Sequence, residues 1–443
     1  MNIQLSEHFT YGKLLRFTLP SIVMMIFTSI YGVVDGYFVS NYVGKTPFAA
    51  LNFIMPFLMI LGAVGFMFGT GGSALISKTM GEGDSEKANR LFSLFVYMTA
   101  VCGVAIAALG IAFIRPVAAA LGAEGDMLEN CVLYGRIVLA ALPFYMLQFE
   151  FQSFFSAAEK PQTGLAVTVL SGVTNIILDW LFIKILSLGL VGAAAATALG
   201  QAVGGIVPLI YFGRKNTSLL RLGRTKFYGR AILKACTNGS SELMTNISMS
   251  LVNMLYNIQL MKYAGQDGVA AYGVLMYVNM IFIAAFIGYS VGAAPIVGYN
   301  YGAENTAELK GLLKKSAVII GCFSVSMILL SRVLARPLAE IFAGYDEGLF
   351  DLTLRGFSIF SISFLFSGVS IYGSSFFTAL NNGLISALIS FLRTLVFQVA
   401  AVLLLPLILD TDGIWYSVAA AEFMSLIITV IFIFIMRKKY NYI

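Results

Sequence analysis

Long apolar runs are the feature that most restricts how this 443-residue chain can fold. Hydrophobic residues make up 59% of the sequence and charged residues 11%, whereas roughly 25% of the residues in a soluble domain are charged. Many runs reach the length of about 20 residues that a helix needs to cross the hydrocarbon of a bilayer. Segments that cross lipid are helices or strands of a closed barrel, and the period-two alternation of barrel strands is absent here. The sequence therefore predicts an all-α, polytopic membrane protein.

Twelve membrane-spanning helices can be drawn, and an even number places both termini on one side of the membrane. Loops on that side hold 19 of the 28 Lys and Arg residues. Because cytoplasmic loops carry the excess of positive residues, both termini are predicted to be cytoplasmic. The expected spans are residues 14–41, 48–77, 92–116, 129–157, 163–187, 190–212, 231–262, 269–299, 313–336, 350–380, 383–408 and 412–436.

The second half of the chain repeats the first at a shift of 221 residues. Residues 41–50 align with 262–271, and Gly81 aligns with Gly302. The repeat predicts two six-helix bundles, and since six is even, both bundles enter the membrane from the same side, as in transporters built from parallel repeats.

We therefore predict three segments. The N-terminal lobe covers residues 1–212 and the C-terminal lobe covers residues 231–443. Between them, residues 213–230 form a polar, positively charged cytoplasmic linker.

Two aspartates lie inside apolar spans of the first half. A charge at the centre of a bilayer costs from about 3 to more than 10 kcal/mol, so such residues usually serve a function. Asp35 lies in the first span, and Asp179 lies in the fifth span one helical turn after Asn175. At 1.5 Å per residue, Asp35, Asp179 and Thr197 all lie roughly 9–12 Å below the outer surface. These residues can therefore share one layer.

Asp35, Asn175, Asp179 and Thr197 together offer two carboxylates, an amide carbonyl and a hydroxyl. Such oxygens are typical ligands of hard cations, and a carboxylate can also carry a proton. We predict that these four residues bind Na⁺ or H⁺, and the residue types leave the choice of ion open. The alternative for each acid is a structural ion pair with an embedded Arg, but these spans offer no Arg at that depth.

A third embedded acid of the first half, Glu150, shares a helical stripe with Met146, Ser153 and Phe154. Aromatic and Met side chains attract organic cations, so this stripe is a candidate wall of a substrate cavity. The alternative is a Glu150 that is hydrogen-bonded within its own bundle.

Pro20 lies inside the first span, where it removes a backbone hydrogen bond and can bend the helix. It is a candidate conformational hinge that moves Asp35, or else a static kink. In the second half we interpret Glu242, Glu422 and Arg393 as structural, with Arg393 reaching the interface or a backbone carbonyl.

Several kinds of chemistry are disfavoured by the sequence. The four cysteines, Cys102, Cys131, Cys236 and Cys322, have no CxxC spacing, and the single histidine, His8, lies in the N-terminal tail. These positions predict neither a disulfide framework nor a zinc site. The net charge of +6 comes mostly from loop Lys and Arg, so it indicates topology rather than nucleic-acid binding. We expect no enzyme activity and no cofactor other than a coupling ion.

Three motifs of the first half are similar to those of a known family. Residues 34–39 (Val-Asp-Gly-Tyr-Phe-Val), 175–179 (Asn-Ile-Ile-Leu-Asp) and 189–197 (Gly-Leu-Val-Gly-Ala-Ala-Ala-Ala-Thr) resemble the MATE (multidrug and toxic compound extrusion) transporters. The resemblance covers essentially the whole chain and looks closest to the bacterial MepA-type or DinF-like branch.

The resemblance implies a V-shaped pair of six-helix bundles around a central cavity, and export of cationic, lipophilic drugs in exchange for Na⁺ or H⁺. It assigns a cation site to Asp35, Asn175, Asp179 and Thr197, and a bending first span to Pro20. One departure is Trp180, which follows Asp179 where many members of the family have Pro. The resemblance therefore does not imply a proline kink in the fifth span of this chain.

We predict a secondary active multidrug antiporter that works by alternating access as a monomer in the bacterial cytoplasmic (inner) membrane. Its expected partners are small cationic drugs and the lipid bilayer. A lipid or lipid-linked oligosaccharide flippase is the same-class alternative, although its cavity would need Arg and Lys for pyrophosphate. An intramembrane aspartyl protease is the remote alternative, and neither aspartate has the Gly-x-Gly-Asp context of such an enzyme.

Overall fold

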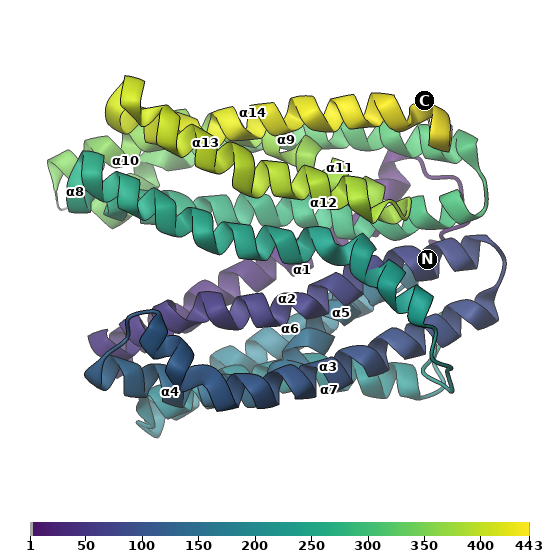
Figure 1. Cartoon of the computed structure of the whole chain (residues 1–443), viewed down its shortest axis with the longest axis horizontal. Coiled ribbons are helices and arrows are strands. Elements are labelled where there is room, and N and C mark those ends of the chain that lie inside the picture. Colours follow the sequence, from purple (N-terminus) through teal and green to yellow (C-terminus); the bar gives the residue numbers. More distant parts are fainter. Residues whose placement is uncertain (1–2, 345, 443) are drawn as a thin grey trace.

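The computed structural model describes residues 3–344 and 346–442, and helix is the regular structure found throughout that part of the chain. The ends of the two predicted lobes, residues 1–2 and 443, lie outside the described residues. Helices α1–α7 form one half of the molecule and α8–α14 form the other (Figure 1). The first half contains α1 (Tyr11–Phe38), α2 (Lys45–Gly81), α3 (Ser85–Ala120), α4 (Gly125–Ala140), α5 (Leu142–Ala157), α6 (Pro161–Asp179) and α7 (Gly189–Gly213). The second half contains α8 (Gly229–Gly302), α9 (Thr306–Ala343), α10 (Glu347–Phe360), α11 (Phe364–Ala379), α12 (Gly383–Phe391), α13 (Phe397–Leu404) and α14 (Pro406–Tyr440).

Ten of the described helices are long and apolar enough to cross a membrane. Helices α4 and α5, bent by 55° at their junction, make an eleventh span when they are counted together. Helix α8 has 74 residues, and Gly265 interrupts it with φ 63° and ψ −153°. Because this backbone conformation ends a helix, α8 supplies two spans rather than one. The predicted all-α architecture with up to twelve spans is confirmed.

Short π-helical or 3₁₀ segments extend or join several helices. A π-helix gains one residue per turn and often marks a functional site. The π segments are η1 (Val39–Val43), η2 (Trp180–Ile185) and η4 (Leu392–Val396), and the 3₁₀ segment is η3 (Ser361–Ser363). The first two directly follow the helices that carry Asp35 and Asp179.

Helix α1 passes through Pro20 without interruption, from Tyr11 to Phe38. Its N-cap is Thr10, whose side chain accepts a hydrogen bond from the Lys13 N–H. The role of Pro20 as a hinge stays a prediction, because a single conformation does not test it.

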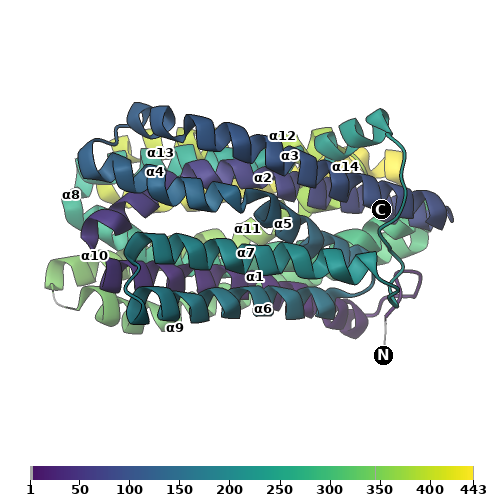
Figure 2. The ribbon, with the colours of Figure 1, turned by 90° about the horizontal axis from the view of Figure 1, so that it is seen from below.

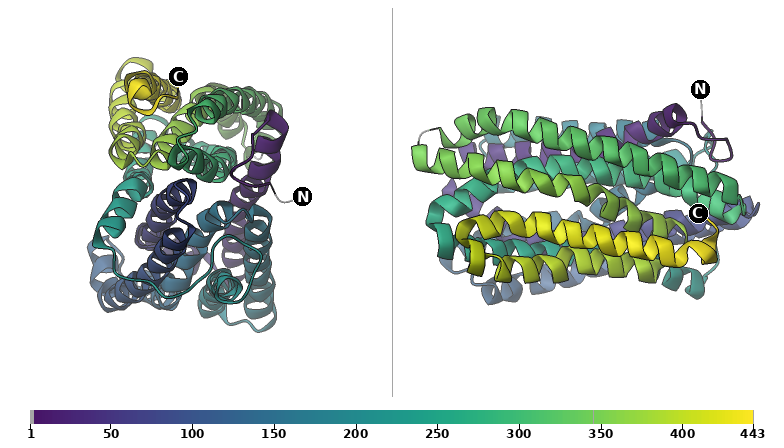
Figure 3. Two further views of the ribbon diagram at one scale, coloured as in Figure 1. Left: turned by 90° about the vertical axis from the view of Figure 1, so that its right-hand side faces the viewer. Right: turned by 90° about the horizontal axis from the view of Figure 1, so that it is seen from above.

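The two halves touch most closely at the end that carries both termini, and they diverge from there (Figures 1 and 3). Glycines of α2 and α8 make these contacts. A Cβ atom at Gly239 would lie 1.9 Å from the carbonyl oxygen of Met67, and one at Gly302 would lie 2.0 Å from that of Lys78. Small residues allow helix backbones to approach this closely, and such packing is a main source of helix association in lipid.

Helix α1 also belongs to this junction, since it packs on the second part of α8. A Cβ atom at Gly288 would lie 2.5 Å from the Cα of Ile22, and one at Gly292 would lie 3.0 Å from the Cα of Thr18. Farther from the termini, the junction helices carry exposed methionines, with Met59 48% and Met254 66% exposed. The closest packing between the halves is therefore concentrated at one end of the molecule.

A glycine substitution tests this junction. We expect Gly239→Ala to destabilise the protein by about 1–3 kcal/mol, because the new methyl group overlaps the α2 backbone. Gly321→Ala in α9 is the matched control, since a Cβ atom there meets nothing within 4 Å, and Ala favours helix over Gly. Thermal unfolding of the purified variants measures both changes, and equal transition temperatures would contradict the proposed role of the junction.

Candidate functional site

Three helices of the first half, α1, α6 and α7, pack side by side and carry the four predicted cation ligands (Figure 2). Two glycines permit this packing. A Cβ atom at Gly172 of α6 would lie 2.5 Å from the Phe27 ring of α1. A Cβ atom at Gly200 of α7 would lie 2.9 Å from the Cβ of Asn175. The helices therefore meet at the level of the predicted site.

The carboxyl groups of Asp35 on α1 and Asp179 on α6 lie within interaction range of one another. The Thr197 hydroxyl of α7 is 3.5 Å from Oδ1 of Asp35 and also donates to the carbonyl oxygen of Ala193 at 3.1 Å. Asp35 is 6% exposed, Asn175 3% and Asp179 0%. The structure thus brings the four predicted residues together, with Thr197 half-buried and the other three buried.

Several polar atoms of this group lack partners. Both carboxylate oxygens of Asp179 and both amide atoms of Asn175 are buried without a hydrogen bond to the described residues. A buried polar group normally has a partner, and the exceptions in a native structure need an explanation. Unsatisfied carboxylate and carbonyl oxygens are suited to a hard cation, or to a proton on one carboxylate.

The described residues contain no cluster of three or more His, Cys, Asp or Glu side chains that could hold a metal ion. The predicted Na⁺ site differs from such a cluster because half of its ligands, Asn175 and Thr197, are neutral. The four residues fit a monovalent cation by their donor types, and binding itself stays a prediction.

Both aspartates lie next to π-helical backbone. Helix α6 ends at Asp179 and continues as η2, which begins at Trp180. Helix α1 continues as η1 one turn after Asp35. The position after Asp179, where many MATE members have Pro, thus begins a π segment in this chain.

Tyr134 on α4 also lies at the site, although it was not among the residues predicted from the sequence. Its hydroxyl is buried without a hydrogen-bond partner, and it lies within interaction range of Asp35, Asp179 and Thr197. A Tyr in an apolar span resembles a packing residue, so this role could not be predicted from the sequence. Tyr31, one turn before Asp35, extends the polar group toward Gln148 of α5.

The predicted substrate-cavity residues lie inside the first half. Met146, Glu150 and Phe154 are 0% exposed and Ser153 is 4% exposed. A Cβ atom at Gly69 of α2 would lie 2.9 Å from the Cα of Glu150. Both Glu150 oxygens lack a hydrogen-bond partner among the described residues. In this conformation none of the four faces an open surface, and their contact with substrate stays a prediction.

Arg393 forms a buried ion pair, contrary to the expectation that it reaches the interface or a backbone carbonyl. Its Nε donates to both carboxylate oxygens of Glu422, at 3.1 and 2.9 Å. The Arg393 side chain is 13% exposed and that of Glu422 is 6% exposed. Glu242 on α8 lies within electrostatic range of Arg393. Arg393 is thus a cationic partner for both Glu422 and Glu242, the two embedded acids of the second half.

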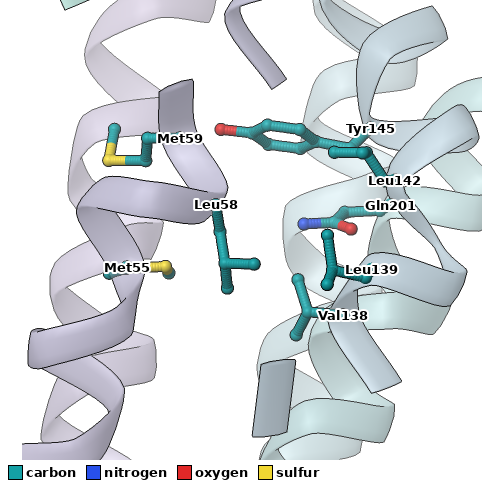
Figure 4. Close-up of a pocket in the computed structure, with 8 residues that line it drawn as sticks. All are labelled: Met55, Leu58, Met59, Val138, Leu139, Leu142, Tyr145 and Gln201. Carbon is teal, nitrogen blue, oxygen red and sulfur yellow. The ribbon is translucent and has the colours of Figure 1, made fainter. Parts of the chain in front are cut away.

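A small cavity is lined in part by α7, the helix that also carries Thr197 (Figure 4). Its volume of about 40 Å³ holds a water molecule but not a drug. Gln201, one turn after Thr197, points into it together with Tyr145. The other lining residues are Met55, Leu58, Met59, Val138, Leu139 and Leu142.

The comparison with known families decides the identity. The MatE family model matches residues 20–181 and again residues 243–404, once in each half. The chain belongs to the MatE family. It is therefore a multi-pass membrane transporter and not an enzyme, which excludes the intramembrane protease.

The curated relatives of this MatE chain include multidrug export proteins named MepA. The protein from Staphylococcus haemolyticus is 27% identical over 373 residues, which cover 82% of this chain and 81% of the relative. The protein from Staphylococcus aureus strain MRSA252 is 22% identical over 431 residues, with 97% and 94% coverage. The expected likeness to the MATE family and its MepA-type branch is confirmed.

Solved MATE structures share the fold. A structure described as the outward-facing conformation of a multidrug resistance MATE family transporter has a TM-score of 0.93 at 21% identity, covering 100% of this chain and 99% of that one. A MATE structure in complex with MaL6 also has a TM-score of 0.93, at 20% identity and 98% coverage of both chains. At these identities the likeness concerns the fold alone.

Stability measurements test the close acid pair. We expect Asp179→Asn to stabilise the ion-free protein by about 1 kcal/mol or more, because it removes a second buried carboxylate that has no counter-ion. Asp267→Asn, at an exposed position, is the control and should change stability little. The measurement is thermal unfolding in a buffer without Na⁺ at neutral pH, and a clear destabilisation by Asp179→Asn would contradict the electrostatic interpretation of the pair.

Proposed function

We propose that this MATE transporter is a secondary active multidrug antiporter that exports cationic, lipophilic compounds in exchange for Na⁺ or H⁺ by alternating access. We further propose that it acts as a monomer in the bacterial cytoplasmic membrane, with both termini in the cytoplasm. The similarity to the multidrug export proteins named MepA supports multidrug export.

The observation that carries the coupling is the buried acid pair, since neither Asp35 nor Asp179 forms an ion pair with a Lys or Arg among the described residues. Asp35 and Asp179 repel each other when both are ionised, and an entering cation offsets that repulsion. The Asn175 amide and the Thr197 hydroxyl add neutral oxygens that favour Na⁺. A proton would need only a carboxylate. A requirement for Asn175 and Thr197 in coupling would therefore distinguish Na⁺ from H⁺.

The membrane potential can drive the cation inward, because it is worth about 2.3 kcal/mol per charge for each 100 mV. Coupling to export requires that the cation and the drug prefer different conformations. Packing concentrated at the terminus end of the molecule supports assignment of this conformation as closed toward the cytoplasm. In our proposal, cation binding to this conformation favours release of drug to the outside.

The flippase alternative has less support. A cavity for lipid pyrophosphate would need unpaired Arg or Lys, whereas Arg393 already binds Glu422. The acids of the first half would instead repel such an anionic group. Charge therefore favours cationic substrates.

Export from proteoliposomes tests the proposal. We expect Asp35→Asn and Asp179→Asn to lower gradient-driven ethidium export at least tenfold, because each removes a carboxylate that the coupling cation needs. The Na⁺ gradient and the pH gradient are imposed separately, so that the wild-type response also identifies the ion. Asp267→Asn is the control for an exposed acid, and undiminished export by both site variants would refute the coupling role.

Thr197→Val separates the two ions further. The substitution keeps the shape of the side chain and removes the hydroxyl. If Na⁺ is the coupling ion, we expect the Na⁺ concentration for half-maximal export to rise about tenfold, the effect of roughly 1.4 kcal/mol. Unchanged Na⁺ dependence would argue against Thr197 as a ligand.

A further inference from the structure

The chain segment before α1 lies across both halves of the molecule. Residues 3–10 are described without regular helix and lead into α1, which belongs to the first half. In the end-on view of Figure 3, this N-terminal part of the chain lies beside helices of both halves. We refer to residues 3–10 as the N-terminal strap.

One anchor of the strap is in the first half. The Leu5 N–H donates to Oε1 of Glu159 at 2.6 Å. Glu159 lies between α5 and α6, and the Leu5 side chain is 0% exposed. A buried Leu and a hydrogen bond to a carboxylate fix this end of the strap.

The second anchor is in the other half. The Phe9 N–H donates to Oε1 of Glu308 at 2.9 Å, and Nδ1 of His8 is 2.6 Å from Oε2 of the same carboxylate. The Lys315 ammonium donates to the Phe9 carbonyl oxygen. The Phe9 side chain is 0% exposed and meets the Phe17 ring edge to face at 6.0 Å.

The position of Glu308 in α9 makes these contacts informative. Asn305 caps α9 by accepting a hydrogen bond from the Glu308 N–H, so Glu308 is the third helical residue. A Glu there commonly reaches back to the N–H of the cap residue. In this chain the Asn305 N–H donates to the Asn300 carbonyl oxygen instead. The Glu308 carboxylate binds the strap.

The linker between the halves makes the corresponding contact with the first half. Residues 214–228 lead into α8 of the second half but dock on α3 of the first half. The Arg221 N–H donates to Oδ1 of Asn89 at 2.7 Å, and the Gly223 N–H donates to Oγ of Ser93 at 3.0 Å. At the shift of 221 residues α3 corresponds to α9. Each half thus has its third span covered by the segment that leads into the other half.

We propose that the N-terminal strap holds the two halves together at the end that carries the termini, and that it leaves Glu308 before the halves separate there. The inference rests on the alternating access of the proposed function. It assigns to Glu308 the role of a positioning residue that affects the balance of conformations and touches neither cation nor drug.

A distance measurement in nanodiscs tests the strap directly. Spin labels are placed at Ser85 and Leu384, two exposed positions at the terminus end of either half, in a full-length background in which the native cysteines are replaced. We expect Glu308→Gln to raise the ratio of separated to closed molecules about tenfold, because the neutral amide weakens both strap contacts. Replacing residues 3–9 by a Gly-Ser sequence of equal length should produce a change in the same direction.

Glu304→Gln is the matched control, since this exposed Glu lies in the same α8–α9 loop. A closed distance for Glu304→Gln together with separation for Glu308→Gln supports the strap. Identical distance distributions for the wild type, Glu308→Gln and the Gly-Ser variant would overturn it. No cation gradient is present in this measurement, so its failure leaves the cation coupling untouched, and the export assay with Asp35→Asn tests that coupling separately.

Discussion

The main physical constraint on the first half is that its helix packing buries two carboxyl groups close together in an apolar surrounding. Asp35 and Asp179 come from helices distant in sequence, and both side chains are almost fully buried. Isolated like charges in a medium of low dielectric are unfavourable unless a cation or a proton is present. The close approach of α1, α6 and α7, made possible by Gly172 and Gly200, holds the pair together. Helix packing therefore creates a site that a cation would complete.

The two halves share a fold but differ in how they neutralise buried charge. In the second half Arg393 binds Glu422 through two short contacts, so this charge is satisfied inside the protein. In the first half Asp179 and Asn175 retain unpartnered polar atoms. A repeat alone would produce the same chemistry in both halves. Among the described residues, the buried acids without a hydrogen-bond partner, Glu150 and Asp179, lie in the first half, which indicates that the fold supplies the scaffold and not this chemistry.

Close packing between the halves is confined to one end, where glycines of α2 and α8 allow backbone contact. Contacts of this kind are lost together when the helices separate, since they depend on a fit of a few tenths of an ångström. The N-terminal strap and the linker lie at this same end and join the halves by hydrogen bonds, and buried side chains such as Leu5 and Phe9 add apolar packing. The contacts that join the two halves are thus gathered at one end of the molecule.

The sequence by itself determined the helices, their number within the membrane and the residues Asp35, Asn175, Asp179 and Thr197 as one group. These follow from hydropathy, from the depth of a residue along its span and from the i, i+4 spacing, all of which can be counted along the chain. The tertiary structure alone decided that Tyr134 joins this group, that Glu150 and its stripe are buried, and that Arg393 binds Glu422. It also decided that residues 3–10 bind Glu308. These contacts depend on how each helix is rotated and tilted against its neighbours, and close packing between side chains sets that rotation while hydropathy leaves it undetermined.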